Sequence, residues 1–371
     1  MLLDKRCLVE PYDERSIARK GLSSSRMSLR VSDDVTVVDE LSVLMTVKNV
    51  IGTIERCLDS IESQKYGRSF EIVIVDAAST DGTTDYLKGR ARSNRNLRLF
   101  VRDSSQPEAL SHAFNERLVS SKYVALIDGD AVADENWLSE LLASMRKGSV
   151  VAGGPCLTPK GVNLLQRLIG YDSDLRFMRM VEGEVTRLPN MNLCVDREFF
   201  ARVGFDLSFP LAYDMELGHR LSTIGKRIYF NPRAVVWHYH RSSIRAYVKQ
   251  QVQGSKHALR VFRKYPNASL GDNINSLRML IDAPFLSLLV LSVFLLPFGF
   301  LFSITASLAS ACLLISISSK TCELMLKFRK SETILCAILY LVRSECWLIG
   351  LLGSVPELLR NLRLRKPESR P

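Results

Sequence analysis

Two aspartates on either side of a glycine, Asp128-Gly129-Asp130, form the pattern in this sequence that points most directly to chemistry. They follow the apolar run 123–127, which predicts a buried strand. Residues i and i+2 of an extended backbone point to the same side, and the glycine leaves room for a ligand. Two adjacent carboxylates repel unless a cation lies between them. Hard oxygen ligands suit Mg²⁺ or Mn²⁺, and the phosphates of a substrate usually complete the coordination of these ions. A nucleotide diphosphate fits this geometry, and a solvated acidic turn explains the tripeptide alone equally well.

Two further aspartates occupy positions that suit ligand binding or proton transfer. Asp76 ends the apolar run 70–75, where its carboxylate could accept hydrogen bonds from a base or ribose; the alternative is a helix cap. Asp214 precedes a predicted helix and could take a proton from an acceptor hydroxyl. Taken alone, Asp214 is better explained as an N-cap.

The elements that must position these aspartates alternate between strand and helix. Apolar strands are predicted at residues 41–47, 70–75, 97–101 and 123–127, with amphipathic helices between them. This rhythm predicts an α/β fold with a mostly parallel sheet covered by helices on both faces. In such sheets ligands bind beyond the carboxyl ends of the strands, and two of the four strands end in aspartate.

A long apolar region follows. From Ala283 to Ser319 there is no charged residue. One helix of that length would measure about 55 Å, nearly twice the roughly 30 Å of a bilayer core, so we expect a hairpin with a turn at 297–305. The next apolar stretch, 334–355, contains Arg343 and Glu345, which are costly in lipid. We expect a re-entrant or interfacial element there; a third crossing with these two residues paired is the alternative.

The charge distribution supports a membrane surface as the partner. The chain has a formal net charge of +11, and basic residues flank the apolar region on both sides. Such flanks are typical of a cytoplasmic membrane face, and they favour the lipid bilayer over nucleic acid as the partner. The eight cysteines are scattered without a Cys-x-x-Cys pair, which predicts neither a disulfide framework nor a zinc site. The first residues carry charges and no apolar core, so we expect no signal peptide.

Four motifs, in their order and spacing, resemble those of the inverting family 2 glycosyltransferases. They are the strand 41–49, the segment 74–83 with Asp76, Asp128-Gly129-Asp130, and Tyr213-Asp214. The resemblance spans about Val43 to His240 and implies a GT-A fold, a mostly parallel sheet sandwiched by helices, followed by a C-terminal helical membrane region. The expected parts are an extension (1–38), the GT-A domain (39–240), amphipathic interfacial helices (241–282), a transmembrane hairpin (283–319) and a basic loop, membrane segment and tail (320–371).

The resemblance also implies a role for individual residues. Asp214 corresponds to the catalytic base, and a nucleotide-sugar donor and Mg²⁺ or Mn²⁺ are the implied ligands. The implied metal ligands are Asp128, Asp130 and His238, with Asp130 favoured as the direct ligand. For His238, packing beside Trp237 is an equal alternative. The implied donor-binding residues are Thr46, Val47, Asn49, Asp76, Asp128 and Asn192.

The sequence departs from the family pattern at three places. Ala77 stands where a second aspartate is usual, which predicts fewer contacts to the nucleoside, and Tyr213 replaces a glutamate before Asp214. Residues 249–253 differ from the Gln-x-x-Arg-Trp motif of processive synthases. We therefore expect transfer of a single sugar.

The expected function is metal-dependent, inverting transfer of this sugar to a hydroxyl or phosphate, on a polyprenyl-linked or other membrane acceptor. The protein is expected to be a multi-pass cell-membrane protein with a cytoplasmic catalytic domain. A sugar-phosphate nucleotidyltransferase is one alternative, but residues 47–52 match its glycine-rich phosphate loop poorly. A non-catalytic membrane adaptor is the other, and it would not need Asp128, Asp130 and Asp214 together.

Overall fold

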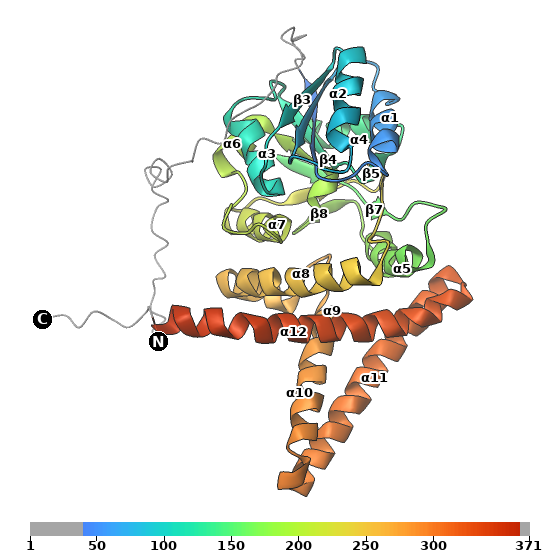
Figure 1. The fold of residues 1–371 in the computed structure, drawn as a ribbon, viewed down its shortest axis with the longest axis vertical. Helices are drawn as coiled ribbons and strands as arrows, with labels where there is room; N and C mark the ends of the chain where they lie inside the picture. Colours follow the sequence, from blue (N-terminus) through green and yellow to red (C-terminus); the bar gives the residue numbers. More distant parts are fainter. Residues whose placement is uncertain (1–39, 364–371) are drawn as a thin grey trace, which may run out of the picture.

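The computed structural model describes residues 40–363, apart from the side chains of residues 278, 279 and 355–363. Figure 1 shows an α/β domain, two long helices that run side by side beneath it, and a helical hairpin that points away from the domain. The predicted extension, residues 1–38, lies outside the described residues.

The central sheet has eight strands in the order β3-β2-β1-β4-β9-β6-β10-β8. Its first four strands pair in parallel and start and end within one residue of the predicted positions. They are β1 (Leu41–Val47), β2 (Glu71–Asp76), β3 (Leu97–Val101) and β4 (Tyr123–Asp128). The predicted α/β class with a mostly parallel, helix-covered sheet is confirmed for this half of the domain.

The register of these strands brings the predicted site residues to one edge. Val47 lies opposite Asp76, and Thr46 lies opposite Asp128. Asp76 ends β2 and Asp128 ends β4, the two strands that flank β1. Because parallel strands end at the same edge of a sheet, both aspartates lie at the carboxyl edge, on either side of the end of β1. The alternation along β1 places Val43 and Met45 on one face of the sheet and Leu44 on the other, and all three are fully buried.

Helices cover both faces of the sheet because each contributes an apolar stripe to one of two cores. The face of Val43 and Met45 packs against α1 (Ile54–Glu62), α2 (Thr83–Ser93) and α4 (Trp137–Arg146). The face of Leu44 packs against α3 (Gln106–Asn115), α6 (Arg197–Val203) and α7 (Tyr213–Thr223).

The second half of the sheet is mixed and was not predicted. Its strands are β6 (Val151–Gly153), β8 (Gly183–Val185), β9 (Leu193–Asp196) and β10 (Ile228–Phe230). β9 runs antiparallel between β4 and β6. A separate three-stranded sheet consists of β5 (Ala131–Ala133), β11 (Val236–His238) and β7 (Cys156–Leu157). Its register places His238 opposite Ala131, directly after Asp130.

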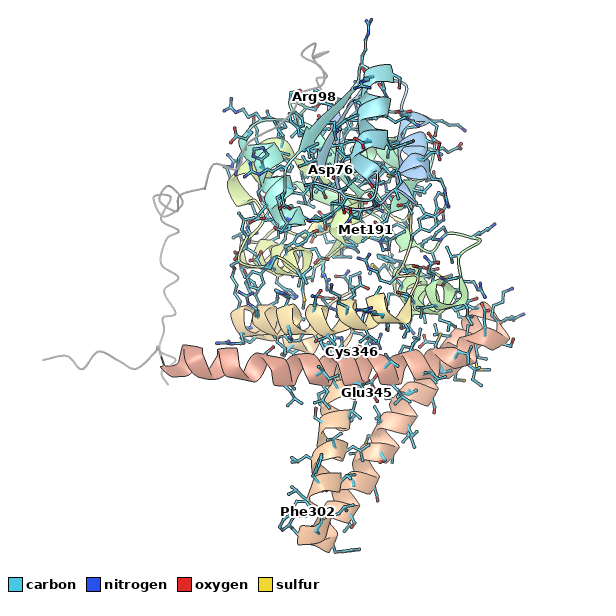
Figure 2. All side chains as sticks on the ribbon, in the orientation of Figure 1. Asp76, Arg98, Met191, Phe302, Glu345 and Cys346 are labelled. Atoms are coloured by element: carbon cyan, nitrogen blue, oxygen red, sulfur yellow. The ribbon has the colours of Figure 1, made fainter. Side chains whose placement is uncertain are left out.

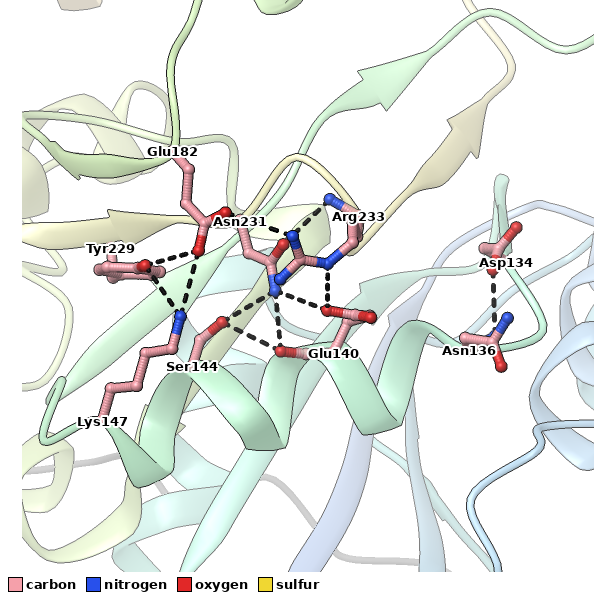
Figure 3. A network of polar contacts seen from close by, with 9 residues as sticks. All are labelled: Asp134, Asn136, Glu140, Ser144, Lys147, Glu182, Tyr229, Asn231 and Arg233. Carbon is pink, nitrogen blue, oxygen red and sulfur yellow. Dashed lines mark hydrogen bonds and ion pairs between the residues drawn. The ribbon is translucent and has the colours of Figure 1, made fainter.

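A polar network fixes the loop that leads into β11 (Figure 3). The amide nitrogen of Asn231 donates to the backbone oxygen of Glu140 and to the hydroxyl of Ser144, at 3.0 Å each. The guanidinium of Arg233 bonds the Glu140 carboxylate at 3.0 Å. Next to this loop, a Cβ on Gly154 would lie 2.0 Å from the carbonyl oxygen of Ala234, so only glycine fits. These contacts set the position of β11 and therefore of His238.

The C-terminal part consists of four long helices joined by short helical turns. They are α8 (Ile244–Lys264), α10 (Asp282–Phe294), α11 (Phe300–Phe328) and α12 (Cys336–Arg363), with the short α9 (Leu277–Leu280) before α10. The helices α10 and α11 form the hairpin, while α12 lies alongside α8 and runs across the base of the hairpin (Figure 1).

The hairpin exposes large apolar side chains. At its tip Phe294, Phe298, Phe300 and Leu301 are 74–77% exposed. By length and composition, two segments of the described chain could cross a membrane, Phe300–Phe328 and Ser331–Ser354. The second segment contains Arg343, which forms an ion pair with Asp172 of the globular domain at 3.0 Å rather than with Glu345.

Candidate functional site

A cavity of about 750 Å³ lies along the carboxyl edge of β1 and β4; we call it the strand-edge cavity. The hydroxyl oxygen of Thr46 is buried at its wall and has no hydrogen-bond partner within residues 40–363. A buried polar atom without a partner is costly, so a ligand that bonds this hydroxyl would be stabilised. Of the predicted site residues, Thr46, Val47, Asn49, Asp128 and Asp130 line this cavity.

Asp128 and Asp130 differ in their partners. The Asp128 carboxylate accepts hydrogen bonds from Gln106 (2.6 Å) and Asn190 (3.4 Å). Burial and the neighbouring Asp130 carboxylate raise the pKa of Asp128. An oxygen of Asp130 lies 3.5 Å from Nε2 of His238, which lowers the pKa of Asp130 in spite of its burial. Burial lowers the pKa of His238, but the charge and hydrogen bond of Asp130 together with the charge of Asp128 raise it overall.

This donor set fits a divalent cation that shares its coordination with a ligand. Residues 40–363 contain no group of three His, Cys, Asp or Glu side chains placed to hold a metal ion by themselves. Asp130 and His238 form a pair of potential ligands, and Asp128 is the last residue of β4, two residues before Asp130. Mg²⁺ sites commonly have one or two carboxylates and are completed by phosphate oxygens and water. The assignment of Asp128, Asp130 and His238 as metal ligands therefore stays a prediction.

Gly129 packs closely against the end of β1 and also lines the strand-edge cavity. A Cβ on Gly129 would lie 2.8 Å from a methyl group of Val47 and 3.0 Å from one of Val50. The space on the side where a Cβ would project is thus filled by Val47 and Val50, while Gly129 itself lines the strand-edge cavity. That the glycine leaves room for a ligand stays a prediction.

Asp76 is fully buried and bonds its own loop. One carboxylate oxygen accepts the backbone N–H and the hydroxyl of Ser79 at 3.0 and 2.6 Å, and the other accepts the hydroxyl of Thr84. The side chain of Asn49 bonds the same loop through the backbone N–H of Thr80 at 2.8 Å. The N-cap of α2 is Gly82, so Asp76 is not the helix cap of the alternative explanation; its contacts brace the loop between β2 and α2. The predicted donor contacts of Asp76 and Asn49 stay predictions without direct support.

The structure likewise gives Asn192 a structural position. Its side-chain amide is fully buried. The amide oxygen accepts a hydrogen bond from the indole N–H of Trp137 at 2.8 Å, and the amide nitrogen donates to the carbonyls of Pro155 and Ala234 at 2.9 and 2.8 Å. All its polar atoms are used, so the expectation that it faces the donor is not supported. Asn190, two residues earlier, is the side chain of this segment that reaches Asp128.

Asp214 lies in the first turn of α7 and lines a second cavity of about 540 Å³, the Asp214 cavity. The N-cap of this helix is Ala212, so Asp214 is not the cap. One carboxylate oxygen bonds the guanidinium of Arg187 at 3.1 Å, and the side chain is 19% exposed. The charge of Asp214 contributes to the raised pKa of Asp128, and together with burial both carboxylates raise the pKa of Tyr213. The three aspartates therefore lie in one electrostatic neighbourhood.

Two arginines complete the site and were missed in the sequence. Arg241 is exposed and lines both the strand-edge cavity and the Asp214 cavity, so it lies where the two meet. Arg187 bonds Asp214 from the segment before Asn190. Neither belongs to a periodic pattern or a recognisable motif, so no signal in the sequence distinguished them from the other basic residues.

Comparison with family models decides the classification. The model described as Glycosyl transferase family 2 matches residues 42–201, and that described as Glycosyl transferase family group 2 matches residues 123–343, more than half of the chain. The chain belongs to the family 2 glycosyltransferases. The predicted family and the prediction that the protein is an enzyme of this class are confirmed.

Individual relatives of this glycosyltransferase include archaeal enzymes. Glycosyltransferase AglE of Haloferax volcanii is 28% identical over 44% of this chain, and the chain spans about half (55%) of that relative's length. A dolichyl N-acetyl-alpha-D-glucosaminyl phosphate 3-beta-D-2,3-diacetamido-2,3-dideoxy-beta-D-glucuronosyltransferase of Methanococcus voltae is 21% identical over 78% of this chain and 89% of that enzyme.

A solved structure shares the fold. The mannosyltransferase PcManGT from Pyrobaculum calidifontis, in complex with GDP-Man and Mn²⁺, has a TM-score of 0.53 and 17% identity. The match covers 86% of this chain and 88% of that chain. The predicted GT-A fold of this glycosyltransferase is thereby confirmed.

Proposed function

We propose that this glycosyltransferase transfers a single sugar, with inversion, from a nucleotide-sugar donor to a hydroxyl or phosphate of a polyprenyl-linked or other membrane acceptor. The observation that carries the proposal is the pair of adjoining cavities. One is lined by Asp128 and Asp130 and the other by Asp214, and Arg241 lines both. A donor diphosphate at the first two carboxylates and an acceptor at the third would meet beside Arg241.

Asp128, Asp130 and His238 would hold the cation, Mg²⁺ or Mn²⁺. A cation bound there supplies Lewis-acid neutralisation of the negative charge on the leaving diphosphate. The hydrogen bond from Gln106 holds the Asp128 carboxylate in place, and the contact with His238 does the same for Asp130. The Mn²⁺ and GDP-Man in the structure of PcManGT support a cation and a nucleotide-sugar as ligands of this fold.

Asp214 would act as the general base. Its ion pair with Arg187 and the backbone N–H of Met215, at 2.8 Å, fix the orientation of the carboxylate toward the Asp214 cavity. It would accept the proton of the acceptor hydroxyl while that oxygen attacks the anomeric carbon from the face opposite the diphosphate. No covalent sugar intermediate is required, because the bond to the acceptor forms as the bond to the diphosphate breaks.

The proposed location is the cytoplasmic face of a cell membrane, with the hairpin α10–α11 inserted in the bilayer. The exposed phenylalanines at the hairpin tip and the flanking basic residues support this placement. The name of the Methanococcus voltae relative, which specifies a dolichyl phosphate sugar, supports a lipid-linked acceptor.

The first test is the binding of nucleotides to the full-length protein in detergent. We expect one class of nucleoside diphosphate or nucleotide-sugar to raise the unfolding temperature only with Mn²⁺ or Mg²⁺ present, by mass action. Asp130→Ala should abolish this shift. The matched control is Asp85→Ala on α2, an aspartate whose side chain is 83% exposed, which should keep it. If no nucleotide stabilises the wild-type protein, the non-catalytic adaptor replaces this proposal.

The second test separates binding from chemistry. Asp214→Asn should retain the nucleotide-dependent shift but lower sugar transfer by about 10²–10⁴-fold, the usual contribution of a general base. Transfer at the wild-type rate would contradict the assignment of Asp214.

A further inference from the structure

A third cavity lies between the globular domain and the two helices beneath it. It measures about 320 Å³ and is lined by residues of α5 (Leu164–Met178), α8 and α12; we call it the arginine cavity. Its apolar walls come from Leu168, Ile169, Leu339 and Trp347. The arginine cavity adjoins the Asp214 cavity, because Arg187, Gln250, Gly254, Asn275 and Trp347 line both.

Two arginines in this cavity carry buried N–H groups without acceptors. Arg343 of α12 is 7% exposed; its Nη1 bonds Asp172 at 3.0 Å, and its guanidinium lies 4.9 Å from the ring centre of Tyr340. Its Nη2 is buried and has no hydrogen-bond partner in the described chain. Nε and Nη1 of Arg187 are also buried without a hydrogen-bond partner there, although Nη1 lies 3.8 Å from an Asp272 oxygen.

The unpaired N–H groups of the cavity, rather than its net charge, favour an anion. Arg176, Arg187 and Arg343 line it together with one carboxylate, Asp172, while Asp214 and Asp272 contact Arg187 from outside the lining. Both oxygens of Asp172 are already bonded, one by the Tyr340 hydroxyl and the other by Arg343 and Arg176. Leaving a buried charged donor unpaired costs free energy, and phosphate oxygens are the acceptors that guanidinium groups bind best.

We propose that the arginine cavity binds the phosphate or diphosphate group of a lipid-linked acceptor, with Arg187 and Arg343 as its ligands. This inference rests on the function proposed above and specifies how the acceptor is held. The lipid source is favoured over free phosphate because the walls are apolar and α12 lies across the base of the hairpin (Figure 2), next to the proposed membrane surface.

Arg187 connects the arginine cavity with the proposed catalytic base, Asp214. Its Nη2 bonds Asp214, its Nε and Nη1 have no hydrogen-bond partner in the described chain, and the residue lines both cavities. A phosphate bound at Arg187 would therefore place the sugar attached to it in the Asp214 cavity, with a hydroxyl near the proposed base. The same guanidinium orients the base and anchors the acceptor.

The test is a binding titration of the full-length protein in detergent, followed by tryptophan fluorescence because Trp347 lines the cavity. The probes are geranyl phosphate, geraniol and inorganic pyrophosphate. We expect geranyl phosphate to bind more tightly than either of the others, since it alone has both the phosphate and the apolar chain. Arg343→Gln should weaken its binding about ten-fold or more, as expected for loss of charged hydrogen bonds, and Arg343→Lys should restore part of the loss.

Matched variants separate specific binding from general charge and from misfolding. Lys330→Gln removes an exposed cation of the same region and should leave the affinity for geranyl phosphate unchanged. Gln251→Phe, on the half-buried α8 wall, should block binding while both arginines remain and adds no tryptophan to the fluorescence signal. The metal-dependent nucleotide shift, which depends on the strand-edge cavity, should persist in every variant and reports correct folding.

Two results would overturn the inference. Equal affinity for pyrophosphate and geranyl phosphate would assign the cavity to a soluble anion, and full affinity in both Arg343→Gln and Gln251→Phe would place the lipid elsewhere. Either result leaves the nucleotide shift intact, so it is distinguishable from failure of the proposed function, in which that shift itself is missing.

Discussion

The substitution Asn192→Ala tests whether Asn192 stabilises the fold or binds the donor, as the resemblance to the family implied. The substitution removes three hydrogen bonds that link the indole of Trp137 and the carbonyls of Pro155 and Ala234. All three lie between buried groups, and each contributes about 1 kcal/mol net. The expected loss in free energy of unfolding is therefore about 3 kcal/mol, with more if the three partners stay unpaired.

For a domain of roughly 200 residues, about 3 kcal/mol corresponds to a fall in unfolding temperature of about 6–12 °C. The assay is a thermal melt of the detergent-solubilised variant, with the donor KM measured below the transition. We expect the KM to change less than about two-fold, because no atom of Asn192 is free to bind the donor. The matched variant is Asn190→Ala, which should cost less than about 1 kcal/mol yet weaken the donor site, since Asn190 bonds Asp128.

The reasoning would be refuted by the opposite pattern. If Asn192→Ala melts at the wild-type temperature and its donor KM rises ten-fold or more, then Asn192 binds the donor. The buried contacts of the described structure would then belong to a form of the enzyme without its ligand.

Two further predictions concern stability. Burial raises the pKa of Asp174 to about 6 from 3.8, so the folded state binds an extra proton between these pH values. The free energy of unfolding therefore falls as pH rises through that range, by about 3 kcal/mol in total. Asp174→Asn has no such proton to lose, so its unfolding temperature should rise relative to wild type between pH 4 and pH 7. A difference between the two unfolding temperatures that is the same at pH 4 and pH 7 would contradict this. Gly129→Ala should cost about 1–3 kcal/mol because its Cβ would press on Val47 and Val50. Gly89→Ala, with nothing within 4 Å of its Cβ, is the control and should be tolerated in the same thermal melt.

The sequence was most informative where local patterns decide the structure. The four parallel strands were predicted within one residue, because each is a short apolar run with turn residues at its ends. The edge at which Asp76 and Asp128 meet follows from parallel pairing alone. The second half of the sheet could not be predicted in this way, since β6, β8 and β10 have only three residues each.

Side-chain partners were much less predictable than strands. Asp76 and Asn192 were expected to face a ligand, yet both are fully buried. The partners of Asn192 are 37 to 55 residues away in sequence, and those of Asp76 lie in the loop after β2 and the start of α2. Arg343 was recognised as costly in lipid, but its actual partner, Asp172, lies far away in sequence. Such pairs depend on how α5 and α12 dock, which no periodicity encodes.

The position of α12 has a consequence for the order in which the enzyme is made. The side chains of Arg343 and Trp347 close cavities whose other walls come from α5, α8 and the segment around Arg187. A ribosome synthesises those earlier segments first, then the hairpin, and α12 last. The α/β domain can therefore fold before α12 is made, but the arginine cavity stays open until α12 docks against α8. If the hairpin inserts in a bilayer as proposed, the proposed acceptor site is closed only after that insertion.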